Sequence, residues 1–342
     1  MDGKKEFKAF LQVYLTILGI LSFCFLVVRK FPKGVPRLVF ILPIISIFTY
    51  LPLQLNSVHL QGMIAGVITW VCSSKLILFA FDQGPLSCYP ATNFLPFIYL
   101  ACLPVQLKDH NPNSCKKGPK STFNYTVKIL LLASLFKIYK YRDFIHPNLL
   151  LILYGWHLYF ILELILAITA IPARALLRYE IAAQFDEPYL CTSLQDFWGR
   201  RWNLMITGIL RPSVYLPVRN FFTPILGRKW ALGLGQVSTF AVSGLMHELI
   251  YWYLSHEKPT WEVTWFFVLH GVCTTLEILA KSYLRDRWQL HSIVSRVLTI
   301  GFVVVTASWL FFAQPLRYKF DLRMKLESHQ LANYIKGAIY AH

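Results

Sequence analysis

Apolar residues run along this chain in long stretches with few or no charges, separated by short polar connections. Each stretch approaches the ~20 residues that a helix needs to cross the ~30 Å hydrocarbon layer of a bilayer. A lipid-exposed backbone must satisfy its own hydrogen bonds, so we expect every span to be helical. The strongest candidate spans are approximately residues 9–28, 38–55, 60–81, 148–171, 231–254, 260–281 and 293–314.

Two further apolar segments are weaker candidates for spans. Residues 92–107 form a short segment that contains two prolines, which favours a re-entrant structure. Residues 123–139 are interrupted by Lys128 and Lys137 and suit a helix that lies in the membrane interface. The pattern predicts an all-α fold, a polytopic transmembrane helical bundle of roughly seven to ten spans with interfacial helices.

Residues 172–230 differ from the rest of the chain, because they are basic and contain several prolines and two tryptophans. The cations of this segment are Arg174, Arg178, Arg200, Arg201, Arg211, Arg219, Arg228 and Lys229. Such a composition predicts a surface-associated segment between spans, folded into short amphipathic helices on the cytosolic side. With no internal repeat in the sequence, residues 1–342 are expected to form a single membrane-embedded domain.

Composition supports the membrane assignment and limits the function classes. The chain is 56% hydrophobic and only 15% charged, whereas a soluble domain carries about a quarter of its residues as charged side chains. The net charge of +17 would suggest nucleic acid in a soluble protein. In a membrane protein it indicates basic loops against anionic headgroups, so we expect the lipid bilayer and no nucleic acid as a partner. The seven cysteines show no pairing or metal-binding spacing, which predicts neither disulfides nor a metal site.

The most informative polar group is His247, because a polar side chain inside an apolar span is energetically expensive. Ser243, His247 and Tyr251 recur every four residues and share one helix face. Several small residues nearby let neighbouring helices approach closely: Gly233, Gly235, Ser238, Ser243 and Gly244. A neutral imidazole there can accept a proton, which makes His247 a candidate general base; the alternative is a plain interhelical hydrogen bond.

A second constellation spans residues 193–203. Ser193, followed three residues later by Asp196, has the spacing of a helix-start capping box. Trp198 and Trp202 lie four residues apart and are predicted to form one aromatic face, suited to the membrane interface and to substrate contact.

The polar residues of the same segment are candidates for substrate recognition. Arg200 and Arg201 could bind the phosphates of CoA, and Asn203 could donate a hydrogen bond to a carbonyl or an oxyanion. The alternative is an anchor helix with solvated arginines. His270 is a further candidate for lining the substrate cavity, and it lies two turns before Glu277 in the 260–281 span; an interhelical contact is its alternative.

Several enzyme classes are excluded by spacing. His247 and Glu248 begin like the zinc protease pattern HExxH, but Tyr251 stands at the position of the second histidine. The histidines show no HxxxH or HxxHH spacing, the acids no DxxxD pair, and no phosphate-binding GxxxxGK[ST] loop is present. These patterns leave a metal-free mechanism without a cofactor.

The sequence resembles the plant wax synthase family within the membrane-bound O-acyltransferases. The similar segments are residues 76–86, 193–203, 243–251 and 259–264, and together with weaker likenesses they cover nearly the whole chain. The combination of FWGRRWN and SGLMHE is specific, whereas either motif alone would be weak.

The resemblance implies a multi-pass enzyme of the endoplasmic reticulum that esterifies a hydroxyl acceptor with acyl-CoA. It also implies that His247 matches the family's catalytic histidine and Asn203 its second polar active-site residue. A long-chain fatty alcohol is the expected acceptor, giving a wax ester, and a sterol is the alternative. A membrane transporter or lipid-binding scaffold is the alternative of another class, although the matching halves typical of transporters are absent from the sequence.

Overall fold

A computed structural model of the chain describes residues 3–88, 90–107, 121–177, 180–284, 290–320, 322–324 and 326–327. Over these residues the chain is mostly helical and has no strand; longer non-helical connections precede α5 and include residues 180–187. An isolated antiparallel bridge joins Leu107 to Ile181. The prediction of an all-α fold is confirmed.

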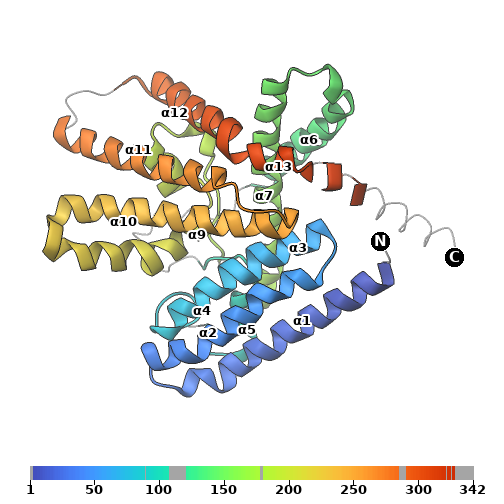
Figure 1. Cartoon of the computed structure of the whole chain (residues 1–342), viewed down its shortest axis with the longest axis vertical. Helices are drawn as coiled ribbons and strands as arrows, with labels where there is room; N and C mark the ends of the chain where they lie inside the picture. Colours follow the sequence, from blue (N-terminus) through green and yellow to red (C-terminus); the bar gives the residue numbers. More distant parts are fainter. Residues whose placement is uncertain are drawn as a thin grey trace.

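The N-terminal helices form a bundle in the lower part of Figure 1. Their bounds are α1 Gly3–Leu26, α2 Val35–Tyr50, α3 Val58–Ile64, the π-helix η3 Ala65–Cys72, α4 Ser73–Ala80 and α5 Phe94–Cys102. The segments α3, η3 and α4 follow one another without a break and make one continuous rod. Its apolar side packs on α1, α2 and α5 around a core that includes Leu21, Phe48 and Phe79.

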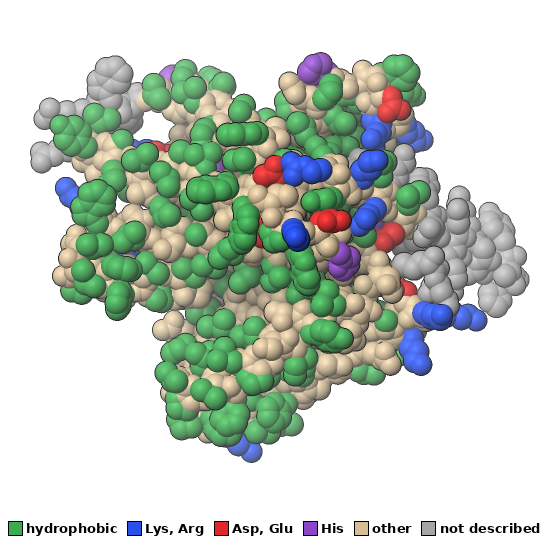
Figure 2. Space-filling model, in the orientation of Figure 1, with side chains coloured by type: hydrophobic (Ala, Val, Ile, Leu, Met, Phe, Trp, Pro, Cys, Tyr) green, Lys and Arg blue, Asp and Glu red, His purple; other side chains and the backbone are tan. Residues whose placement is uncertain are grey.

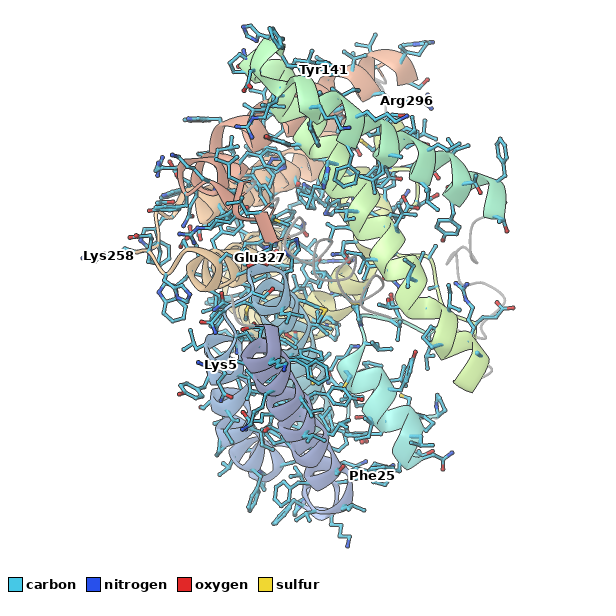
Figure 3. The ribbon with its side chains drawn as sticks, turned by 90° about the vertical axis from the view of Figure 1, so that its right-hand side faces the viewer. Lys5, Phe25, Tyr141, Lys258, Arg296 and Glu327 are labelled. Atoms are coloured by element: carbon cyan, nitrogen blue, oxygen red, sulfur yellow. The ribbon has the colours of Figure 1, made fainter. Side chains whose placement is uncertain are left out.

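A loop at one end of this bundle is fastened by two carboxylates that are far apart in the sequence. Glu6 of α1 accepts hydrogen bonds from the backbone N–H of Asn56 at 3.0 Å and of Ser57 at 2.9 Å. Glu327, close to the end of the described chain, accepts from the backbone N–H of Val58 at 2.7 Å. Figure 3 shows Glu327 near the end of α1 that carries Lys5. The first backbone donors of α3, which have no partner inside the helix, are therefore satisfied by side chains.

Helices α6 (Thr122–Ile138) and α7 (Pro147–Leu177) form a hairpin joined by the turn η4 (Tyr139–Phe144). Figure 1 shows α7 crossing behind the other helices, so that this hairpin connects both halves of the molecule. Lys128 of α6, only 4% exposed, lies against Glu163 of α7 with 2.8 Å between the nitrogen and the carboxylate oxygen. A buried ion pair is tolerated where the geometry is good and further hydrogen bonds complete it.

The second half of the chain builds a layer from two long helices and several short ones. Its elements are η5 Pro188–Leu190, α8 Leu194–Asp196, η6 Phe197–Arg201, α9 Leu204–Leu210, η7 Arg211–Tyr215, α10 Leu216–Ser255, α11 Glu262–Leu284, α12 Ser292–Thr306, η8 Ala307–Phe311 and α13 Ala313–Arg317. Helix α10 is bent at Gly227, where φ is 78° and ψ 162°. Glycine adopts this conformation without the steric cost that a Cβ imposes.

Helices α10 and α11 lie side by side (Figure 1) and approach closely, as the small residues in the sequence predicted. A Cβ added at Gly244 of α10 would meet the Cα of Thr264 at 2.8 Å, and one at Gly271 of α11 would meet the Cβ of Phe240 at 2.9 Å. Real Cβ contacts are essentially never that short. The two glycines therefore set the spacing of the helix pair.

Six helical stretches of the described chain are long and apolar enough to cross a membrane. They are Gly3–Lys30, Val35–Gln54, Val58–Ala80, Pro147–Ala175, Glu262–Leu284 and Ser292–Phe311, and they match six of the seven strong predictions. The seventh, 231–254, forms the second part of α10 but is not among the six. Its glycines, hydroxyl side chains, His247 and Glu248 lower its hydropathy.

The two weaker candidate segments, residues 92–107 and 123–139, contain helices α5 and α6. Helix α5 has nine residues and at 1.5 Å per residue rises about 14 Å, too little to cross the bilayer. The backbone carbonyls of Leu100 and Leu103 at its C-terminal end accept hydrogen bonds from the buried Nζ of Lys75, each at 2.7 Å. This arrangement suits a segment that enters the bundle and turns back. Helix α6 extends over the predicted interfacial stretch.

The outer surface of the protein exposes many large apolar side chains, as contact with lipid requires. Large apolar side chains stand exposed on several helices, among them Phe123, Trp265 and Val305. Figure 2 shows apolar side chains over most of the visible face, while the charged ones gather toward its centre and right side. The chain is therefore a multi-pass membrane protein, in keeping with its apolar spans.

Candidate active site

His247 lies in the second part of α10, and its ring is fixed in one tautomer. The Nδ1 atom is 2.7 Å from the backbone oxygen of Ser243, one helical turn earlier. Because a carbonyl oxygen only accepts, Nδ1 must carry the proton and donate it. The lone pair of a neutral ring is then on Nε2, for which the described part of the chain supplies no hydrogen-bond partner. This is the arrangement that a proton-accepting base needs.

Three aromatic rings surround the imidazole, and we call them the aromatic cluster: Trp70, Phe267 and Phe311. Their centroids lie 5.1, 4.5 and 5.8 Å from that of His247. Tyr251 lies on the same face of α10 as the histidine and donates a hydrogen bond of 3.1 Å to the backbone oxygen of Phe311. This bond holds η8, which carries the Phe311 ring, against α10. The imidazole is therefore half-buried among protein rings.

Two members of the aromatic cluster stand in π-helical segments. Trp70 belongs to η3 and Phe311 to η8. A π turn adds a residue to the helix and redirects the side chains around it, and such turns are frequent at functional sites. The local geometry of these two spans therefore brings their rings to His247.

Asn203 occupies an unusual backbone position directly after η6. Its φ of 40° and ψ of 63° are left-handed, a conformation in which Asn is enriched among non-glycine residues. Its backbone oxygen accepts from the N–H of Ile206 at 3.0 Å and begins α9. Its side-chain Oδ1 is buried and has no partner in the described part of the chain. This oxygen is therefore available to a hydrogen-bond donor on a substrate.

Trp198 connects the Asn203 segment to the His247 helix. Its indole N–H donates a hydrogen bond of 3.0 Å to Nδ1 of His270 on α11. Its ring lies 5.9 Å from that of Phe267, which in turn lies against His247. The two motifs singled out in the sequence, FWGRRWN and SGLMHE, are thereby brought together through Phe267.

Trp198 and Trp202 lie together as predicted, with ring centroids 6.3 Å apart and ring planes at 73°, but they do not share a helix face. Helical geometry ends at Arg201, and Trp202 has an extended backbone with φ −99° and ψ 121°. Both rings point into the protein instead of forming an interfacial face: Trp202 stacks on Phe197 at 5.4 Å. The left-handed Asn203 that follows explains why the helix stops here.

Arg200 and Arg201, both predicted to bind the phosphates of CoA, have different surroundings. The Nε of Arg201 pairs with Asp196 at 2.6 Å, and its Nη1 donates to the backbone oxygen of Asp186 at 3.0 Å. Arg201 therefore holds its own loop together, which leaves less of its guanidinium for a phosphate than predicted. Arg200 is exposed. The predicted helix start is as expected, with Oγ of Ser193 accepting from the N–H of Asp196 at 3.1 Å.

His270 was expected at the substrate, but the structure leaves it no nitrogen for one. The residue is 0% exposed. Nδ1 accepts from Trp198, and Nε2 lies 2.8 Å from Oγ1 of Thr306 on α12. An interhelical contact, the alternative to a place in the substrate cavity, therefore describes His270 better.

Sequence reasoning missed the aromatic cluster and Thr306. Aromatic residues in apolar spans look like ordinary core or lipid-facing residues, and nothing in their spacing distinguishes the three that meet at His247. Their π-helical setting depends on tertiary packing and has no signature in the sequence.

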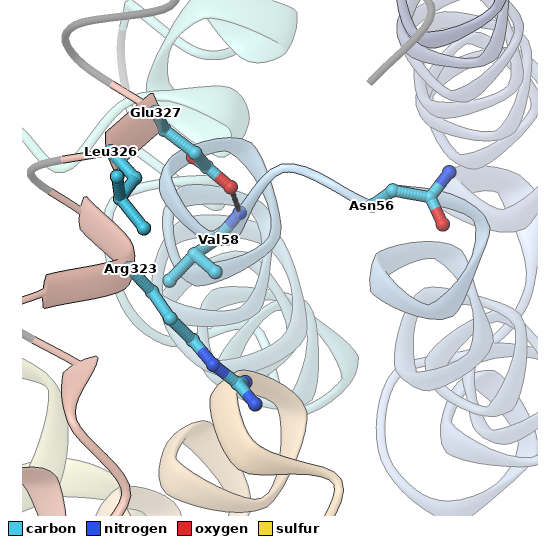
Figure 4. A pocket seen from close by; sticks show the side chains of 5 residues that line it. All are labelled: Asn56, Val58, Arg323, Leu326 and Glu327. Carbon is cyan, nitrogen blue, oxygen red and sulfur yellow. Dashed lines mark hydrogen bonds between the residues drawn. The ribbon is translucent and has the colours of Figure 1, made fainter.

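Two hollows stand out on the described part of the chain, and neither is lined by His247. The larger, about 280 Å³, lies beside the fastened loop and is lined by Asn56, Val58, Arg323, Leu326 and Glu327 (Figure 4). The smaller lies between α7 and residues 182–185. In addition, no group of three or more His, Cys, Asp or Glu side chains among the described residues is placed to hold a metal ion.

Comparison with known proteins identifies the class. Residues 181–269, which include both Asn203 and His247, match the model of the membrane bound O-acyl transferase family. The chain is 41% identical over 314 residues to the acyl-CoA–sterol O-acyltransferase 1 of Arabidopsis thaliana, with 90% of each chain covered. It is 40% identical over 342 residues to the long-chain-alcohol O-fatty-acyltransferase of Simmondsia chinensis, with 98% of this chain and 97% of the relative covered.

These likenesses span nearly the whole chain, and several further relatives from Arabidopsis thaliana carry the name of probable or putative long-chain-alcohol O-fatty-acyltransferases. The chain belongs to the membrane-bound O-acyltransferases, in the group of the long-chain-alcohol O-fatty-acyltransferases that the sequence resembled. It is therefore an acyltransferase that transfers an acyl group to an alcohol.

Proposed function

We propose that the chain transfers a fatty acyl group from acyl-CoA to a long-chain fatty alcohol and forms a wax ester, with His247 as general base. The observation that carries the proposal is the state of the imidazole. Its Nδ1 is fixed by the Ser243 carbonyl, and its Nε2 has no partner among the described residues. The aromatic cluster around it keeps the ring among protein side chains.

In this mechanism Nε2 of His247 takes the hydroxyl proton while the alcohol oxygen attacks the thioester carbonyl carbon. The carbon–sulfur bond then breaks, and the CoA thiolate leaves with the proton that the imidazolium returns. Asn203 donates from its side-chain amide to the oxyanion that develops on the carbonyl oxygen. No metal or cofactor takes part. We further propose that the enzyme works in the endoplasmic reticulum, with exposed Arg200 near the CoA phosphates.

A sterol is the second candidate acceptor. It is favoured by the relative named as an acyl-CoA–sterol O-acyltransferase, whose identity to this chain is as high as that of the long-chain-alcohol relatives. The same base and the same donor serve either hydroxyl, so only the acceptor distinguishes the two.

The test uses microsomes from yeast that lacks its own ester-forming acyltransferases. Labelled acyl-CoA is supplied with a long-chain alcohol or with a sterol. We expect wax ester from the wild-type chain and a loss of about 10²–10⁴-fold in rate for His247→Ala at equal protein level. His157→Ala, at another histidine within a predicted span, is the matched control and should keep near-wild-type activity.

The arms of this test separate the parts of the proposal. Ester formation by His247→Ala at the wild-type rate would reject the general base. Steryl ester as the sole product would reject the fatty-alcohol acceptor and leave the base intact. An absence of label transfer from acyl-CoA, with ester formed from another donor, would reject the acyl-CoA part.

A further inference from the structure

His270 is held in a chain of hydrogen bonds that crosses three elements. The indole N–H of Trp198 only donates, so Nδ1 of His270 must accept. The proton of a neutral ring is then on Nε2 and is donated to Oγ1 of Thr306 at 2.8 Å. That hydroxyl in turn donates to the backbone oxygen of Phe302 at 2.7 Å. Each donor in the chain has an acceptor, and the imidazole is 0% exposed.

Helix α11 holds the same segment at a second point. Two turns after His270, Oε2 of Glu277 accepts from the backbone N–H of Leu194, the first residue of α8, at 2.8 Å. Positions seven apart lie on one helix face, and Leu194 and Trp198 are four apart on the facing segment. Glu277 is also steadied by Lys281, 2.6 Å away. Residues 194–198 are therefore docked on α11 by two polar contacts.

We propose that Trp198, His270 and Thr306 form a positioning clamp that sets the place of the Asn203 segment relative to His247. The inference rests on the proposed function, because it takes His247 and Asn203 as the reacting groups. In the proposed mechanism none of the three clamp residues contacts the substrate, and the clamp acts through His247 and Asn203, which do.

The route from the clamp to the reacting groups runs through direct contacts on both sides. On one side, Oγ1 of Thr207 donates to the backbone oxygen of Trp198 at 3.2 Å and ties the first turn of α9 to it, with Asn203 between them. On the other side, the Trp198 ring packs against Phe267, which lies on His247 at 4.5 Å. A shift of Trp198 therefore displaces both the oxyanion donor and the ring that supports the base.

The first experiment compares two threonines on the same helix. Thr306→Val removes the acceptor for His270. Thr299→Val is the matched control, since Thr299 lies seven residues earlier on α12, is equally buried and bonds only to its own helix at Ser295. We expect Thr306→Val to lower kcat about tenfold with KM for acyl-CoA little changed, because misplacement of a reacting group affects the chemical step. Thr299→Val should stay within about twofold.

The second experiment replaces His270 itself. His270→Gln can still accept from Trp198 and donate to Thr306, so it should recover most of the activity that His270→Leu loses, a loss of about 10–100-fold. Trp198→Phe combined with Thr306→Val should cost little more than the worse single variant, because either change breaks the same chain. All variants are compared at equal amounts of folded enzyme, with the acceptor that the wild-type chain prefers.

The clamp is rejected if Thr306→Val behaves like Thr299→Val, if His270→Gln is as inactive as His270→Leu, or if the double variant loses the product of the two single losses. A parallel rise in KM with kcat unchanged would also reject it, since that pattern indicates substrate binding. These outcomes are independent of His247→Ala: an active His247→Ala enzyme rejects the general base, while the ratios among the clamp variants still report on the clamp.

Discussion

Two polar clusters lie among the helices of this protein, and they differ in how the nitrogen atom at the centre of each is bonded. Around Lys128, one ammonium group contacts Tyr159, Glu163 and Glu187 at 3.1, 2.8 and 3.2 Å. Around His247, one ring nitrogen is bonded and the other has no hydrogen-bond partner in the described part of the chain, and the ring is half-buried beside the aromatic cluster. Asn203 likewise keeps a buried oxygen without a partner.

The contrast separates the structural from the chemical use of polar groups in a membrane protein. A buried charge stabilises little by itself, and it persists where its partners satisfy it. A polar atom without a partner costs free energy when it is buried, and one that lies beside a candidate base is available to a substrate. The Lys128 cluster therefore holds α6 against α7, whereas the His247 region retains unbonded atoms for a substrate. Variants in each region should accordingly affect different measurements.

The largest effect on stability is expected from Lys128→Met. The change leaves the carboxylates of Glu163 and Glu187 in place without the cation between them, and breaking a buried pair costs about 3–5 kcal/mol. The measurement is thermal unfolding of the purified enzyme in detergent, together with activity per folded molecule. We expect a large drop in Tm while the activity of the surviving folded enzyme stays near wild type.

Lys137→Met is the matched control, because Lys137 is on the same helix and exposed. It should change stability by less than about 0.5 kcal/mol. An equal loss from both lysines, or loss of kcat without loss of stability in Lys128→Met, would contradict the division between the two clusters.

An intermediate effect is expected from Gly244→Ala, where the new Cβ would meet Thr264 at 2.8 Å. Because the contact is with the backbone of α11, the helices must separate, at a cost of about 1–3 kcal/mol. His247 lies one turn later on the same helix, so activity should fall by about tenfold in addition. Gly155→Ala in α7, where nothing lies within 4 Å of the added atom, should be neutral or stabilising. Equal behaviour of the two variants would show that the spacing of α10 and α11 does not matter.

How far the sequence could predict this structure depended on how local each signal is. The apolar runs predicted six of the spanning helices, because length and hydropathy are local properties. His247 could be singled out because a histidine in an apolar span is rare. The end of the helix before Trp202 could not be predicted, since it depends on the left-handed backbone of Asn203. The role of His270 was likewise set by Thr306, 36 residues further along the chain, and that of Arg201 in part by the backbone of Asp186, 15 residues earlier.

The smallest effect is expected at the fastened loop, where Glu327 bonds partly exposed groups at the molecular surface. Burial raises the pKa of Glu327, but hydrogen bonds from His59, Val58 and Ser57 outweigh it and hold the pKa below its ordinary value of 4.5. A carboxyl group with a lowered pKa stabilises the fold fully above its unfolded pKa, and the contribution is lost as the pH falls through the lowered value.

Glu327→Gln should therefore lower stability by at most about 1 kcal/mol at neutral pH, since the bonded groups are partly solvated. The measurement is Tm of wild type and variant between pH 7 and pH 3.5, with the exposed Glu257→Gln as control. The gap in Tm should be widest at pH 7 and should close as the pH falls below 4.5. Unlike the His247 variants, Glu327→Gln should leave kcat unchanged, because this carboxylate is bonded to the loop and not held open for a substrate. A gap that is independent of pH would mean that the charge of Glu327 does not fasten the loop.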